Sequence, residues 1–220
     1  EILFDSPVLR AKKLERRHGR LEVALESHRV YVRKAQYSFG WDWGPKLTTS
    51  GIWKNIYLHG YTTARVEHVF VRTVSLSREE AVIRVLVSLE RLRNTPLNVE
   101  ATIEGDGVRV VKRVTVKSDH LSLTMRIPNP RLWWPNGYGA QPLYGASVSI
   151  WQNDARIDSL SVKFGIRSVR LLHGNSGRDS SFVFEVNGKQ IYCKGVNWIP
   201  ADTFLPRIRK DRYVQLLTMA

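Results

Sequence analysis

The stretch LSLTMRI, residues 121–127, alternates between apolar side chains and Ser, Thr or Arg. A period of two places every second side chain on the same face, which is the pattern of a β-strand with one face buried. Segments of the same character lie on both sides of this stretch. They are HVFVRTVSL (68–76), AVIRVLVSL (81–89), LNVEATI (97–103), VRVVKRVTV (108–116), GASVSIWQ (145–152) and ARIDSLSVKF (155–164).

Turn-forming residues separate these segments, at residues 93–96 (RNTP), 105–107 (GDG), 117–119 (KSD) and 152–154 (QND). Short alternating strands with turn signals every 8–12 residues are typical of an antiparallel β-sandwich of immunoglobulin-like size. We therefore expect residues 65–170 to form one complete all-β domain.

The flanks of this domain have too few elements to close a fold of their own. Residues 28–34 (HRVYVRK) and 51–58 (GIWKNIYL) have the pattern of strands around a WDWG turn. On the other side, FVFEV and KQIYCKG are joined by Asn187-Gly188, which predicts a β-hairpin. Residues 206–220 then change to helical spacing. The chain begins without methionine, and we expect it to be an internal segment of a longer protein.

The formal net charge of +14 is the most unusual feature of the composition and on its own suggests a polyanionic partner. Most basic residues alternate with apolar ones, however, as on the wet face of a strand. The densest run, residues 10–20, is better interpreted as a solvated helix or loop. No zinc-finger spacing or basic region followed by heptads is present, so nucleic-acid binding is kept as a minor alternative.

No apolar run reaches the roughly 18 residues that a membrane span needs, and the first residues do not have the order of a signal peptide. The single cysteine, Cys193, excludes an internal disulfide framework. No pattern indicates a metal or another cofactor. The sequence assigns no cellular compartment.

Two clusters could carry recognition chemistry. In SFGWDWGP (38–45), Asp42 stands between Trp41 and Trp43. Carboxylates accept paired hydrogen bonds from sugar hydroxyls, and indole faces pack on the C–H patches of a pyranose. The alternative is a tight turn in which Asp42 bonds nearby backbone N–H groups and the indoles fill a core.

The second cluster, KGVNWIPAD (194–202), places Asn197, Trp198 and Asp202 in a loop just beyond a strand end, where sites are often built. A packed tryptophan is the structural alternative here too. A third aromatic group, LWWPNGYG (132–139), lies in a connection rich in Pro and Gly, and its pattern favours a structural loop.

Four motifs occur in an order that resembles the β-mannosidases of glycoside hydrolase family 2. They are RKAQYSFGWDWGP with GIWKNIYL, LWWPNGYGAQPLY, KFGIRSVRL and FVFEVNGKQIYCKGVNWIPADTF. The resemblance runs from about Arg33 to the C-terminus, and WDWGP favours a β-mannosidase over the β-galactosidases and β-glucuronidases of the family.

The resemblance implies a mostly β chain of three parts. Residues 1–64 would be the C-terminal part of a sugar-binding-like jelly roll, residues 65–170 the immunoglobulin-like sandwich, and residues 171–220 the first hairpin and helix of a (β/α)₈ barrel. Asp42 and Trp198 would contact the terminal mannose of a β-mannoside oligosaccharide or glycan. Trp41, Trp43, Asn197 and Asp202 would be neighbours with a weaker claim.

The resemblance also implies that catalysis is carried elsewhere. Retaining glycosidases need two carboxyls about 5–5.5 Å apart, and the acid/base glutamate of this family follows an asparagine. The sequence contains no Asn-Glu dipeptide. We therefore expect a segment of an exo-acting retaining β-mannosidase that cannot hydrolyse a glycoside without the remainder of the enzyme's chain. A non-catalytic, lectin-like sandwich protein and a polyanion-binding module are the alternatives.

Overall fold

A computed structural model describes residues 1–174 and 182–220, and the chain divides into two compact units. One unit consists of residues 1–58 together with 195–220, and the other of residues 59–194. No helix in the described part of the chain is both long enough and apolar enough to cross a membrane.

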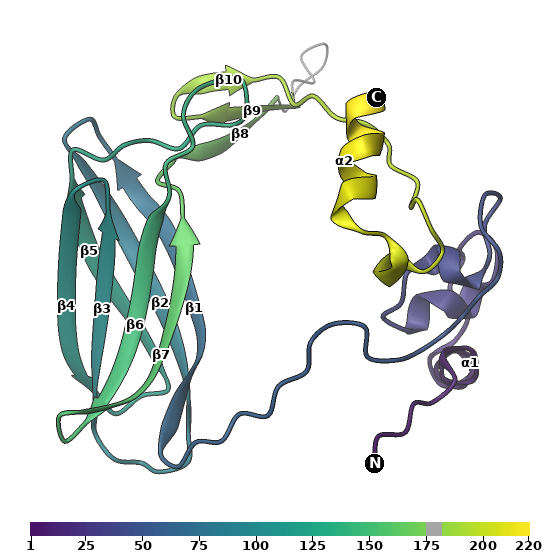
Figure 1. The fold of residues 1–220 in the computed structure, drawn as a ribbon, viewed down its shortest axis with the longest axis horizontal. Helices are drawn as coiled ribbons and strands as arrows, with labels where there is room; N and C mark the ends of the chain where they lie inside the picture. The colour runs from purple at the N-terminus through teal and green to yellow at the C-terminus, as the bar shows by residue number, and fades with distance from the viewer. Residues whose placement is uncertain (175–181) are drawn as a thin grey trace. The chain divides into compact units, whose positions relative to one another are not determined.

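Strands β1 to β7 form a two-layered sandwich in the second unit (Figure 1). They are β1 (Ala64–Leu76), β2 (Glu80–Arg91), β3 (Leu97–Gly105), β4 (Val108–Val116), β5 (His120–Pro128), β6 (Tyr144–Gln152) and β7 (Ala155–Phe164). All pairings between them are antiparallel, in the orders β1-β2-β5 and β4-β3-β6-β7. The prediction of an all-β sandwich is confirmed. The fourth strand, β4, pairs with β3, so the sheet that contains β1 has three strands and the other sheet has four. In the constant-type immunoglobulin sandwich the fourth strand belongs to the sheet of the first strand, which then has four strands and leaves three in the other.

The core lies between the two sheets because the alternating side chains of each strand point inward at every second position. The inward residues of the central strands are buried to within a few per cent: Ala81, Ile83, Val85, Val87 and Leu89 of β2, Leu97, Val99, Ala101 and Ile103 of β3, and Tyr144, Ala146, Val148 and Ile150 of β6. Each fully buried aliphatic side chain contributes roughly 1.5–3 kcal/mol to folding. The sandwich therefore carries most of the chain's hydrophobic stabilisation.

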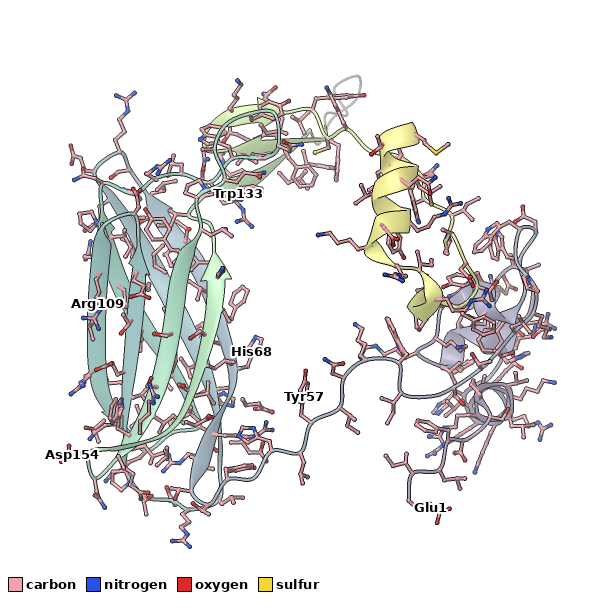
Figure 2. All side chains as sticks on the ribbon, in the orientation of Figure 1. Glu1, Tyr57, His68, Arg109, Trp133 and Asp154 are labelled. Carbon is pink, nitrogen blue, oxygen red and sulfur yellow. The ribbon has the colours of Figure 1, made fainter. Side chains whose placement is uncertain are left out.

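The two sheets are also joined by polar contacts near their edges. The Asp158 carboxylate on β7 accepts a hydrogen bond from the backbone N–H of Val66 on β1 at 2.7 Å, beside a bulge in β1. At the opposite edge, Lys112 of β4 donates from Nζ to the backbone carbonyl of Thr124 on β5 at 3.2 Å. Arg109 lies on the outside of β4 (Figure 2).

A three-stranded antiparallel sheet follows the sandwich, in the order β10-β9-β8. Its strands are β8 (Val169–His173), β9 (Phe182–Val186) and β10 (Lys189–Ile191). Asn187 and Gly188 join the last two with φ angles of 51° and 79°, as a type I′ turn requires. The predicted hairpin is confirmed.

The loop of residues 132–139 packs as a structural loop. The backbone N–H of Trp133 donates to the carbonyl of Ile166 at 2.9 Å, and the Arg167 guanidinium lies 4.7 Å from the centre of the Trp133 ring. Gly165 allows this approach, since a Cβ atom there would lie 2.6 Å from Cγ of Trp133. The side chain of Asn187 links the β9–β10 turn to this loop by donating to the carbonyl of Trp133.

The first unit begins with helix α1 (Pro7–His18), so the basic run forms a solvated helix. The Ser6 side chain accepts from the N–H of Leu9, Pro7 occupies the first turn, and Gly19 ends the helix at a φ angle of 93°. Helix α2 (Lys210–Met219) confirms the predicted C-terminal helix, preceded by a 3-10 turn, η3 (Leu205–Arg207).

The two strands predicted around the WDWG motif are wrong. Residues Ser27–Tyr31 form a short 3-10 helix, η1, and a second one, η2, spans Gln36–Phe39. Residues 51–58 form neither helix nor strand. An alternating pattern becomes a strand only when a neighbouring strand satisfies its N–H and C=O groups, and no described residue pairs with either segment.

Candidate functional site

The WDWG motif forms a tight turn. The backbone N–H of Trp41 donates to the carbonyl of Gly44 at 3.2 Å, and the N–H of Gly44 donates back to the carbonyl of Trp41 at 3.4 Å. Gly40, directly before the turn, has a φ angle of 106°, which glycine adopts without strain. Asp42 and Trp43 occupy the tip, and Asp42 is exposed.

Ring contacts hold both tryptophans of the turn. The centre of the Trp43 ring lies 5.1 Å from that of Tyr37, and the guanidinium of Arg29 lies 5.1 Å from the centre of the Trp41 ring. A cation–π contact of this kind, between a buried guanidinium and a partly exposed indole, is worth about 1–2 kcal/mol. Trp41 is nevertheless 43% exposed, so part of its indole is available to a ligand.

The Asp42 carboxylate makes no hydrogen bond or ion pair with any residue in the described ranges 1–174 and 182–220. The alternative in which Asp42 bonds the backbone of its own turn is therefore not what this structure contains. An exposed carboxylate beside a half-exposed indole has the two components needed to bind a sugar, which are an acceptor for hydroxyls and an apolar face.

The second predicted cluster lies in the loop before α2. Trp198 is 42% exposed and packs at a tilt against Tyr213 of α2, with ring centres 6.0 Å apart. Asn197 is exposed. The Asp202 carboxylate accepts the N–H of Phe204 at 2.8 Å and pairs with Nε of Arg207 at 3.2 Å. Asp202 thus stabilises its own loop, whereas Trp198 keeps a free face.

The two clusters belong to the same compact unit, although more than 150 residues separate them in sequence. Trp41, Asp42 and Trp43 form one group, and Asn197, Trp198 and Asp202 form the other. No hydrogen bond, ion pair or ring contact between described residues connects the groups. The prediction that both contact one sugar stays a prediction.

Sequence reasoning missed the residues that support the turn from η1. His28, which is 7% exposed, packs edge-on against Phe39 with ring centres 5.8 Å apart. Its Nε2 lies 3.1 Å from a carboxylate oxygen of Glu26, whose other oxygen accepts from Nζ of Lys46. The hydrogen bond from Lys46 holds the pKa of Glu26 below its ordinary value. Arg29, whose guanidinium contacts Trp41, is only 4% exposed.

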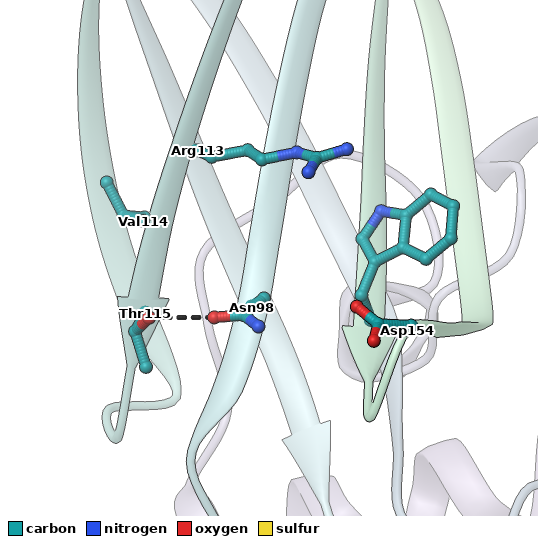
Figure 3. A pocket seen from close by; sticks show the side chains of 6 residues that line it. Asn98, Arg113, Val114, Thr115 and Asp154 are labelled. Atoms are coloured by element: carbon teal, nitrogen blue, oxygen red, sulfur yellow. Dashed lines mark hydrogen bonds between the residues drawn. The ribbon is translucent and has the colours of Figure 1, made fainter.

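A separate hollow of about 340 Å³ lies on the outer face of the four-stranded sheet (Figure 3). It is lined by Asn98, Arg113, Val114, Thr115, Trp151 and Asp154. Thr115 donates to the side-chain oxygen of Asn98 at 2.7 Å, and Arg113 pairs with Glu100. It contains none of the predicted site residues. Among the described residues, no cluster of three His, Cys, Asp or Glu side chains could hold a metal ion.

Comparison with family models gives two matches along the chain. Residues 1–54 match the glycosyl hydrolase 2 galactose-binding domain-like model, and residues 64–167 match the glycosyl hydrolases family 2 model. The second match covers the sandwich, and the first covers α1 and the WDWG turn.

Curated relatives match along almost the whole chain. This chain is 37% identical in sequence to beta-mannosidase B of Emericella nidulans and of Aspergillus oryzae, over 97% of this chain and 26% of each relative. Among solved structures, the beta-D-mannosidase of Dictyoglomus thermophilum is 37% identical, with a TM-score of 0.83 over 98% of this chain and 27% of that one. The exo-chitosanase CsxA of Amycolatopsis orientalis, 20% identical, shares the fold over 72% of this chain and 19% of that one, with a TM-score of 0.56. The chain spans about a quarter of the length of these curated relatives.

Proposed function

Because its two matched domains place this chain in glycoside hydrolase family 2, we propose that it is a segment of an exo-acting, retaining β-mannosidase. The proposed reaction releases terminal β-linked mannose from oligosaccharides or glycans. Support comes from the 37% identity to proteins named beta-mannosidase, which extends over 97% of the chain and so includes both predicted site clusters.

The observation that carries the proposal is the exposed carboxylate of Asp42, which has no partner among the described residues and lies at the tip of a turn whose two tryptophans contact Arg29 and Tyr37. A carboxylate held in this way can accept hydrogen bonds from sugar hydroxyls that do not react. Binding energy gained at such remote hydroxyls orients the scissile bond for chemistry elsewhere. Asp42 is therefore proposed as a substrate clamp, with the free face of Trp198 in the same sugar subsite.

The proposed domain arrangement is the end of a jelly roll in residues 1–64, the sandwich in 65–170 and the start of a (β/α)₈ barrel in 171–220. Because the β9–β10 hairpin is antiparallel and the strands of such a barrel are parallel, the hairpin would precede the barrel's own strands, and α2 would be its first helix. The two catalytic carboxyls of a retaining mechanism are proposed to lie outside these 220 residues. Its partners would be the sugar substrate and the remainder of the same chain.

The experiment that tests the proposal is hydrolysis of aryl β-mannoside, β-glucoside and β-galactoside by the full-length protein. We expect a clear preference for the mannoside. Asp42→Ala should lower kcat/KM on it by roughly 100-fold, about 2.7 kcal/mol of transition-state stabilisation, without unfolding the protein.

A matched control is Asp154→Asn, in the exposed turn between β6 and β7, where a φ angle of 63° suits asparagine equally well. This variant should keep wild-type kcat/KM within about twofold. An unchanged kcat/KM in Asp42→Ala would contradict the clamp, and a preference for another glycoside would contradict the β-mannosidase assignment. Tight mannose binding by the 220-residue chain alone would favour the lectin-like alternative.

A further inference from the structure

Arg29 is a buried cation that has no anionic partner among residues 1–174 and 182–220. Arg29 is only 4% exposed, and its Nε and Nη1 atoms have no hydrogen-bond partner in those ranges. Buried guanidinium groups are normally hydrogen-bonded and paired with a carboxylate, since removing the charge from water is costly. Stability alone therefore does not account for an arginine at this position.

The specific contact that Arg29 makes is with Trp41, whose ring centre lies 5.1 Å from the guanidinium carbon. Trp41 is the first residue of the turn that presents Asp42, and its own N–H and C=O close that turn to Gly44. A contact that fixes the Trp41 indole therefore also fixes the backbone from which the turn starts.

The neighbours of Arg29 hold the chain on both sides of the same turn. His28 packs against Phe39, just before the turn, and Glu26 accepts a hydrogen bond from Lys46, just after it. The Asp42 carboxylate has no described partner of its own. The turn therefore fixes the position of the Asp42 backbone and Cβ, and residues at and beside η1 hold the turn.

We propose that Arg29 is a positioning residue, which acts through Trp41 to hold the Asp42 turn in the orientation that meets the hydroxyls of the terminal sugar. The inference rests on the proposed function. A clamp contributes to catalysis only when it is already oriented before the substrate arrives. This requirement explains why a buried cation stacked on an indole occupies a position that an apolar side chain could fill at lower cost.

A double-mutant cycle in the full-length protein tests the proposal, with Arg29→Met, Asp42→Asn and the double variant assayed on an aryl β-mannoside. Arg29→Met should lower kcat/KM by about 10–30-fold alone and by less than about twofold when Asp42 is already Asn. A merely structural role would lower kcat/KM by the same factor in both backgrounds. Such additive losses, or no loss at all in Arg29→Met, would overturn the proposal.

Two further variants separate the cation from general damage. Arg29→Lys keeps a positive charge near the indole but loses the planar guanidinium that stacks on it, so this variant should recover only part of the loss. Arg17→Met makes the same substitution at an exposed position of α1 and should leave kcat/KM within about twofold.

A readout independent of activity keeps failure of this inference distinct from failure of the proposed function. Fluorine NMR of 5-fluorotryptophan-labelled protein, with Trp41→Phe assigning the Trp41 resonance, reports whether the indole has one orientation. In Arg29→Met this resonance should broaden or split, while that of Trp198, packed on Tyr213, stays sharp. An unaltered Trp41 resonance overturns the positioning role, whichever glycosides the wild-type protein hydrolyses.

Discussion

Glu26 shows how one side chain can bridge two stretches of chain that do not pair as strands. It is the residue before η1, and one of its oxygens accepts a hydrogen bond from Lys46 while the other lies beside His28. The pKa of Glu26 is lowered chiefly by the hydrogen bond from Lys46, with partial burial opposing that shift. Lys46 is half exposed, so water screens the pair and its contribution is modest.

The carboxyl carbon of Glu26 should titrate in NMR with a midpoint below the ordinary value of 4.5. Because the folded pKa is lowered, the contribution of this pair to stability is present above about pH 4.5 and is lost as the pH falls through the folded pKa. Lys46→Met should move the midpoint back upward. A midpoint at or above 4.5 in the wild-type protein would contradict the assigned contact.

The side chain of Asn187 connects two elements, because it links the turn of the β9–β10 hairpin to the end of the sandwich. Its Oδ1 accepts the N–H of Ser168 at 2.9 Å and its Nδ2 donates to the carbonyl of Trp133 at 3.0 Å, while its own N–H donates to the carbonyl of Ser168 at 3.0 Å. One residue therefore shapes the turn and also fixes the hairpin on the preceding loop.

Asn187→Ala should lower the free energy of unfolding by about 1–3 kcal/mol more than Asn153→Ala, as measured by denaturant unfolding of the chain. Asn153 is the matched control, because it also has a positive φ angle, 47°, in a two-residue turn, but is exposed. Both variants lose the left-handed preference of asparagine, so their difference isolates the two side-chain hydrogen bonds. Equal losses would show that the two side-chain hydrogen bonds of Asn187 add nothing to stability.

The elements predicted correctly are those whose signal is local. Alternation in residues 81–89 and 121–127 and the Asn-Gly dipeptide at 187–188 each determine a backbone shape within a few residues. The strands predicted at residues 28–34 and 51–58 failed because strand formation also needs a partner. The site divides in the same way. Residue type alone made Asp42 and Trp198 candidates and left a structural role open for both.

Arg29 could not be chosen, since in HRVYVRK it has the pattern of an outward-facing strand residue. Its burial and its contact with Trp41 arise from packing between η1 and the turn that follows.

The two compact units differ in the internal contacts that stabilise each of them. In the sandwich, β2, β3 and β6 are each hydrogen-bonded on both sides and bury one complete face. In the first unit, large apolar side chains remain exposed, among them Leu3 at 87%, Ile56 at 67% and Leu58 at 102% of full exposure. Cooperative stability is therefore expected to be concentrated in residues 59–194.

Hydrogen–deuterium exchange of the chain should reflect this difference. Amides of β2, β3 and β6 should exchange at least about 100-fold more slowly than those of residues 45–58, since local opening of a segment without strand pairing costs little. The measurement is mass spectrometry of peptides after timed labelling. Protection of residues 45–58 equal to that of β3 would mean that this segment is paired as a strand after all.

The basic residues of strand β4 suggest a role for part of the protein's positive charge other than binding polyanions. β4 is the edge of the four-stranded sheet and carries Arg109, Lys112 and Arg113. An exposed edge is a template on which a second copy can add its own strand, and like charges along it oppose that addition. Lys112 also reaches the edge of the other sheet through the carbonyl of Thr124. We therefore expect these cations to oppose edge-to-edge aggregation of the sandwich, and to do so less when salt screens them.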